Sequence, residues 1–304
     1  KSNKKAQPEL LLDEAASYVS HVFNWQLDDI WSKKELLIKS NAAAEAFFKM
    51  PANANSNQIK AYAHYGYYLA KIMIKAINYE AVLEYPSDTT SFKKELIARY
   101  EQITLESLIK YAWDLGIIVL PLNDSGLFHG ASWNIQGQHV IIVKQNTNSH
   151  SRWIFDLLHE IYHVLDHLQE DNSSIIEVNE LSPFSDQDAL EEREANSFAN
   201  QILFDGKAEE YAQESVRIAN WNLNSLKKAA EKVAHDNKLR VDSLANYLAF
   251  RLSYQNQNWW AQANKLQITD PNPFSIAVNI LKDHISFNQL SPIEQGLLKM
   301  AINI

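Results

Sequence analysis

The chain has 304 residues, a net charge of −9 and no cysteine. Without cysteine, disulfides and thiolate metal sites are excluded, so a metal site must be built from histidine and carboxylate ligands. The negative charge disfavours nucleic-acid binding along the whole chain, because such binding needs a basic surface to replace the counterions of the phosphates. Hydrophobic residues make up 46%, enough for a sizeable core, and the 7 glycines and 8 prolines are few, which favours long helices.

The chain shows neither a membrane span nor a targeting signal. No apolar run approaches the roughly 18 residues of a transmembrane helix, and no signal-peptide pattern opens the sequence. We therefore expect a soluble, cytoplasmic protein with no membrane partner.

Residues 1–50 are expected to form a helical segment that is broken near Asn24. One interpretation is the remnant of a helix-turn-helix. Asp28 and Asp29 lie where a DNA-reading helix would place base contacts, so direct nucleic-acid binding is disfavoured and would be confined to this segment. Residues 57–100 predict a further helical region with an aromatic stripe, which is typical of core packing.

Three short strands are predicted next, over residues 117–122, 128–134 and 139–143. They form a small sheet directly before the most informative motif of the chain. His129 and His139 could line a cleft along this sheet, although a single histidine is more often structural.

Residues 155–167 read Phe-Asp-Leu-Leu-His-Glu-Ile-Tyr-His-Val-Leu-Asp-His and contain the motif HExxH. Apolar residues recur at helical spacing around it, and Ser149 or Ser151 can cap the helix start. His159 and His163 are four residues apart and share one helix face. This spacing lets two imidazoles hold zinc while Glu160 acts as general base on the attacking water. The alternative is a core helix whose histidines are merely hydrogen-bonded.

A catalytic zinc takes three protein ligands, so one more must come from elsewhere. His167 continues the spacing but lies eight residues from His159, about 12 Å along a helix axis. Zinc–nitrogen bonds are only about 2 Å long, which excludes His167 as a partner of His159 on one ion. Residues 169–185 are predicted to be a polar loop covering the site.

An acidic helix over residues 188–199 is the better source of the third ligand. Ser185 and Asp188 predict a capping box at its start. Glu192 and Asn196 are four residues apart, which suits a ligand and a side chain that supports it.

Other acidic residues of this helix leave alternatives open. Ala195, Phe198, Ala199 and Ile202 form an apolar stripe along this helix. Glu191 and Glu192 flank this stripe, whereas Glu194 lies about a quarter-turn from it. A solvated run of charges is the alternative interpretation of the whole helix.

These motifs resemble those of the ImmA/IrrE-type metallopeptidases over about residues 100–205. The matching pieces are residues 155–163, the E-x-E-A-N-x-F-A run of residues 192–199, and the residues 130–132 and 140–142 before the HExxH helix. The resemblance implies a zincin-like metallopeptidase core at 101–205, with His159, His163 and Glu192 as zinc ligands and Glu160 as general base.

Two departures from the family pattern stand beside the match. Tyr162 occupies a position that is usually glycine, and Asp205 a position that is commonly proline. Neither is a ligand, but Tyr162 could narrow the cleft.

The predicted fold is α+β and predominantly α, with a small sheet in the core and helical regions on both sides, the C-terminal one over residues 206–304. The resemblance implies a zinc-dependent endopeptidase that cleaves a specific intracellular protein, such as a DNA-bound transcriptional repressor, in a stress or mobile-element response. The alternative is a non-catalytic regulatory or interaction protein that uses a peptidase-like fold as sensor or scaffold.

Overall fold

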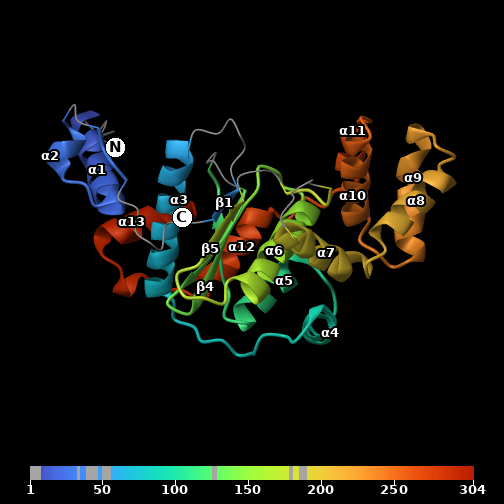
Figure 1. Cartoon of the computed structure of the whole chain (residues 1–304), viewed down its shortest axis with the longest axis horizontal. Coiled ribbons are helices and arrows are strands. Elements are labelled where there is room, and N and C mark those ends of the chain that lie inside the picture. The colour runs from blue at the N-terminus through green and yellow to red at the C-terminus, as the bar shows by residue number, and fades with distance from the viewer. Residues whose placement is uncertain are drawn as a thin grey trace, which may run out of the picture.

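Helices dominate the structure and surround one small sheet, as predicted (Figure 1). The computed structural model describes residues 8–32, 35–38, 47–49, 56–124, 129–177, 181–184 and 190–304. The elements before the sheet's main strands are α1 (Pro8–Phe23), α2 (Leu27–Ile30), β1 (Phe47–Lys49), α3 (Ser56–Ala76), α4 (Thr89–Tyr100) and α5 (Leu105–Asp114).

The middle of the chain holds most of the sheet and two helices that pack together. Its elements are β2 (Ile118–Leu122), β3 (Gly130–Ile135), β4 (Gln138–Lys144), α6 (His150–Tyr162), β5 (Ser174–Glu177) and α7 (Leu190–Phe204). Helices follow to the end: α8 (Ala208–Ile218), α9 (Leu223–Asp236), α10 (Val241–Tyr254), α11 (Trp260–Ala263), α12 (Pro273–Lys282) and α13 (Pro292–Ala301).

The sheet has the strand order β1-β5-β3-β4-β2. β3 pairs antiparallel with both β4 and β5, whereas β1 with β5 and β2 with β4 are parallel. Gln136 and Gly137 join β3 to β4 with φ of 54° and 79°, the positive values that a tight hairpin turn requires. The three predicted strands are confirmed as β2, β3 and β4.

Two strands, β1 and β5, were not predicted. The expected polar loop over residues 169–185 is wrong in part, because it contains β5. Residues 174–177 of that stretch form β5, and the short β1 pairs with it. A four-residue strand with only two isoleucines is too short for a periodicity signal. The predicted capping box of Ser185 and Asp188 lies outside the described residues.

Register places four residues on one face of the sheet. Gly130 stands opposite Glu177, and Ser132 opposite Ile175, so these side-chain positions share a face. Ser132 bonds to Glu160 of α6, which identifies that face as the one covered by α6. In Figure 1 the sheet lies between α3 on one side and α6 on the other.

Two hydrophobic clusters organise the packing. The larger joins the sheet to α3, α5, α6 and part of α7, and the C-terminal residues 277–302 return to it. The smaller is built by residues 204–266 at the other side of α7, around α8, α9 and α10 (Figure 1). α10 also contacts α6, so the smaller cluster supports the HExxH helix from outside the sheet.

The N-terminal segment contains one full helix and one single turn. α1 packs against α3 and α13, and the chain breaks at Asn24 with a φ of 52°. α2 spans only four residues, about one helical turn, which is shorter than the helix that lies in the major groove in a helix-turn-helix. None of the helices in the described ranges is long and apolar enough to span a membrane.

Candidate metal centre

The helix α6 carries the HExxH motif and is buried along nearly its whole length. Its start is capped by Ser149, whose hydroxyl accepts a hydrogen bond from the backbone N–H of Arg152, as predicted. His159 and His163 project from one face, with their Nε2 atoms 3.0 Å apart. From His163 to His167 the helix widens into a π turn, a distortion often found at functional sites.

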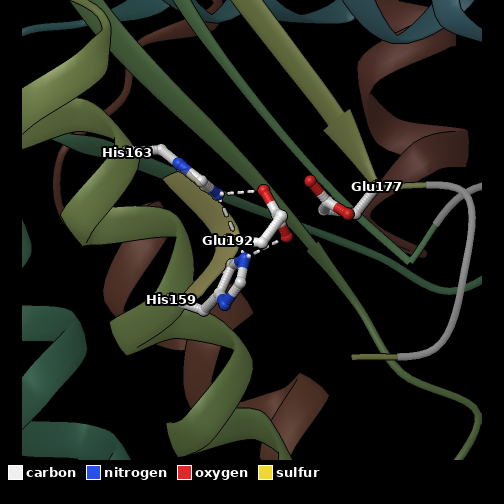
Figure 2. Close-up of side chains that lie close together, drawn as sticks. All are labelled: His159, His163, Glu177 and Glu192. Carbon is white, nitrogen blue, oxygen red and sulfur yellow. Dashed lines mark hydrogen bonds and ion pairs between the residues drawn. The ribbon is translucent and has the colours of Figure 1, made fainter. Parts of the chain in front are cut away.

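Glu192 of α7 completes a compact group of donor atoms. Its two carboxylate oxygens lie 3.2 Å from the Nε2 atoms of His159 and His163, and all three side chains are buried (Figure 2). Two atoms bound to one zinc ion can be at most about 4.2 Å apart, because each bond is about 2.0–2.1 Å long. The structure thus brings together the three residues that the sequence singled out as candidate ligands.

Hydrogen bonds fix the orientation of both imidazoles. The Nδ1 atom of His159 lies 3.1 Å from Oδ1 of Asn196, and that of His163 lies 3.0 Å from Nδ1 of His167. Because an amide oxygen only accepts, His159 donates from Nδ1, and its Nε2 is directed toward Glu192, where a cation could take the place of the Nε2 proton.

These contacts refine two expectations from the sequence. Asn196 reaches across to α6 and supports His159. His167 is not among the donor atoms that surround His159; it stands behind His163 and joins a half-exposed group with Asp166 and Glu194. Glu194 thus lies apart from the buried donors, whereas Glu192 is one of them.

Glu160 is completely buried beside these donors. Ser132 of β3 donates a hydrogen bond to its Oε2, while its Oε1 accepts none from the described residues. Burial raises the pKa of Glu160 to about 8 against the opposing effect of the His159 imidazole, and Glu177 adds to the rise.

A glycine makes room for this carboxylate. A Cβ atom at Gly130 would lie 2.2 Å from Oε1 of Glu160, closer than atoms can approach. Gly130 and Ser132 were noted in the sequence only as part of the family resemblance. The contacts themselves could not be read, because they depend on how β3 lies across α6.

Glu177 is a further buried carboxylate that the sequence analysis did not select. It ends β5, has no exposed surface, and offers an oxygen within 4.8 Å of the donor atoms of His159, His163 and Glu192. In the sequence, Glu177 follows two isoleucines. Its side chain can be assigned to the helix-facing side only once residues 174–177 are known to form a strand, and the sequence did not reveal that strand.

The charges in this group fit a cation. Burial by itself would raise the pKa of Glu192, but hydrogen bonds from His159 and His163 hold the pKa of this carboxyl below its usual range. Three buried carboxyl groups, those of Glu160, Glu177 and Glu192, lie around the two imidazoles, and a buried carboxylate is stable only when its charge is compensated. The donor types and their spacing are compatible with a bound metal ion.

The remaining candidates lie outside the donor group. His139 binds the Leu168 carbonyl oxygen through Nε2 and the Tyr85 hydroxyl through Nδ1. Tyr162 packs its ring against Phe198 and the His167 imidazole. His129 donates its backbone N–H to the Glu177 carbonyl oxygen, which places its backbone next to the site.

Comparison with known proteins identifies the domain. The family model Peptidase M78, described as the IrrE N-terminal-like domain, matches residues 115–236. Residues 115–236 are similar to the IrrE N-terminal-like domain. The match begins before β2 and extends through α9, so it includes both histidines, Glu160, Glu177 and Glu192.

The predicted resemblance to the ImmA/IrrE proteins is thereby confirmed. The family of the IrrE-like domain supports a peptidase-like fold and a metallopeptidase assignment. No curated protein and no solved structure matches the chain.

Proposed function

We propose that the protein is a zinc-dependent endopeptidase. The observation that carries the proposal is the buried group of His159, His163 and Glu192 with the Glu160 carboxylate beside it. Two histidines and one carboxylate are the ligand set of catalytic zinc in peptidases with an HExxH helix. Zinc is favoured over calcium or magnesium because those cations prefer sites made of oxygen ligands alone.

His159, His163 and Glu192 would hold the ion, and zinc would supply a Lewis acid that polarises the scissile carbonyl and acidifies the attacking water. Glu160 takes the proton from that water and later donates it to the leaving amine nitrogen. The Ser132 hydroxyl keeps one Glu160 oxygen fixed, so the other oxygen is directed to the proton transfer. Asn196 and His167 keep the imidazoles in place throughout.

We further propose that the substrate is a specific intracellular protein, such as a transcriptional repressor that controls a stress or mobile-element response. The family match supports this choice. The sheet supports a selective enzyme, because β3 and β5 beside the site each have a strand on both sides. An extended peptide therefore finds no free strand edge next to Glu177 in the described sheet, and general backbone pairing is disfavoured.

Metal removal and restoration test the proposal. A lysate of the cells that make the protein is incubated with the wild type, with chelator-treated protein, and with treated protein after zinc is added back. New protein N-termini are then labelled and sequenced. We expect termini that appear with the wild type, vanish after chelation, return with zinc, and are absent with Glu160→Gln. Identical termini in all four samples would favour a regulatory or scaffold protein without peptidase activity.

A further inference from the structure

Glu177 is a buried carboxyl group with no role in the reaction proposed above. Its exposed fraction is 0%, and it occupies a helix-facing position of the sheet opposite Gly130. A buried carboxylate needs hydrogen-bond donors, an opposite charge or a metal ion near it. The imidazoles of His159 and His163 offer ligand atoms within 4.8 Å of one of its oxygens.

The backbone of Glu177 is held from two directions. Its carbonyl oxygen accepts a hydrogen bond of 2.7 Å from the His129 N–H, and β5 pairs with β3 on one side and β1 on the other. The side chain thus starts from a fixed point at the end of β5. In Figure 2 its carboxylate points toward that of Glu192, across from the two imidazoles.

The distances place Glu177 within reach of the same ion. One of its oxygens lies within 4.8 Å of the donor atoms of His159, His163 and Glu192. Donors on one tetrahedral zinc ion lie about 3.3 Å apart, because each bond is about 2.0–2.1 Å long. A torsion change in the Glu177 side chain would bring its oxygen to such a distance.

We propose that Glu177 is a fourth protein ligand, which closes the metal site in the resting protein. This inference rests on the proposed function, because it concerns the same ion. Two histidines and two glutamates fill the four positions that zinc usually has in proteins, whereas a catalytic zinc keeps one position open. Water and substrate gain access only when Glu177 is released from the ion or the coordination number rises. Closure by Glu177 would therefore slow cleavage by the wild type without abolishing it.

The test uses Glu177→Gln, which keeps the size of the side chain and removes its charge. Glu294→Gln is the matched control, since Glu294 is another buried glutamate but belongs to α13, away from the site. Zinc affinity is measured by competition with a chromophoric chelator. The cobalt(II)-loaded proteins are then titrated with azide, a small anion that binds at an open metal position. Thermal unfolding checks that each variant is folded.

Loss of a ligand should weaken zinc binding of Glu177→Gln by at least about tenfold, since even supporting residues around a metal contribute that much. Azide should change the cobalt spectrum of Glu177→Gln at a concentration at least tenfold lower than for the wild type, with Glu294→Gln behaving as the wild type. Equal zinc affinity and equal azide response in all three proteins would overturn the inference.

The two proposals fail in different ways. Cleavage that depends on Glu160, together with zinc and azide binding unaffected by Glu177→Gln, would leave the peptidase intact and refute the fourth ligand. Metal binding that depends on Glu177, with no cleavage by the wild type or by Glu177→Gln, whose metal site is open, would refute the peptidase and leave a closed metal site. If Glu177→Gln abolishes cleavage while zinc and azide binding are unchanged, Glu177 contacts the substrate and is not a ligand.

Discussion

Gly130→Ala tests whether the position of Glu160 depends on a missing side chain in the neighbouring strand. The added Cβ would lie 2.2 Å from Oε1 of Glu160, and ordinary contact begins at 3.4 Å, so the carboxylate must move by about 1.2 Å (3.4 − 2.2 = 1.2). Gly130 is not among the residues with positive φ, so backbone strain does not contribute. The effect therefore comes from crowding alone.

Crowding of a packed interior costs about 1–3 kcal/mol of unfolding free energy. A displacement of about 1 Å in a reacting group can lower the rate about 100-fold. We expect Gly130→Ala to lose cleavage by that factor and to keep zinc affinity within about tenfold, because His159, His163 and Glu192 are not touched. Urea unfolding, chelator competition and cleavage of the natural substrate measure the three effects.

A double-mutant cycle isolates the contact. In a Glu160→Ala background the added methyl meets no carboxylate, so Gly130→Ala should cost little stability there. Gly296→Ala is a control for crowding elsewhere, since its Cβ would lie 2.5 Å from the Tyr18 hydroxyl between α13 and α1. If Gly130→Ala cleaves at the wild-type rate and destabilises both backgrounds equally, Glu160 does not occupy the position described.

Three further outcomes are expected. Glu192→Ala should lose stoichiometric zinc while Glu194→Ala retains it, measured by metal analysis after gel filtration, and the reverse would reassign the ligand. Asn196→Ala should weaken zinc binding about 10–100-fold by releasing His159, whereas unchanged affinity in a chelator competition would contradict that support. Burial lowers the pKa of His139 from its usual 6.5, so the unfolded chain binds a proton at this residue more readily than the folded chain does. The free energy of unfolding, measured with urea, should therefore decrease as the pH is lowered from about 7.5 to about 5.5. The decrease should be smaller in His139→Gln.

The candidate ligands could be proposed from the sequence because their signal is local. His159 and His163 are related by one helical turn, and Glu192 was indicated by its spacing from Asn196 and by the family resemblance. The strands β2, β3 and β4 were predicted for a similar reason, since each is a run of apolar residues between turn residues.

The surroundings of the site could not be predicted, because they depend on strand register. Gly130 and Glu177 are 47 residues apart in the sequence (177 − 130 = 47) and face each other only because β3 pairs with β5. Asn196 was paired with Glu192 because helical spacing reveals neighbours within one helix. Its contact with His159 depends on how α7 packs against α6, which no local pattern contains.

We propose that the buried histidines and glutamates form a metal-dependent peptidase site, and this is best tested by measuring metal content and cleavage together in Glu160→Gln and the wild type. Glu160 is not among the proposed ligands, so both proteins should bind stoichiometric zinc, and only the wild type should generate new N-termini in its substrate. A wild type without zinc, or a Glu160→Gln protein that cleaves as fast as the wild type, would show that the site is not a metal-dependent peptidase.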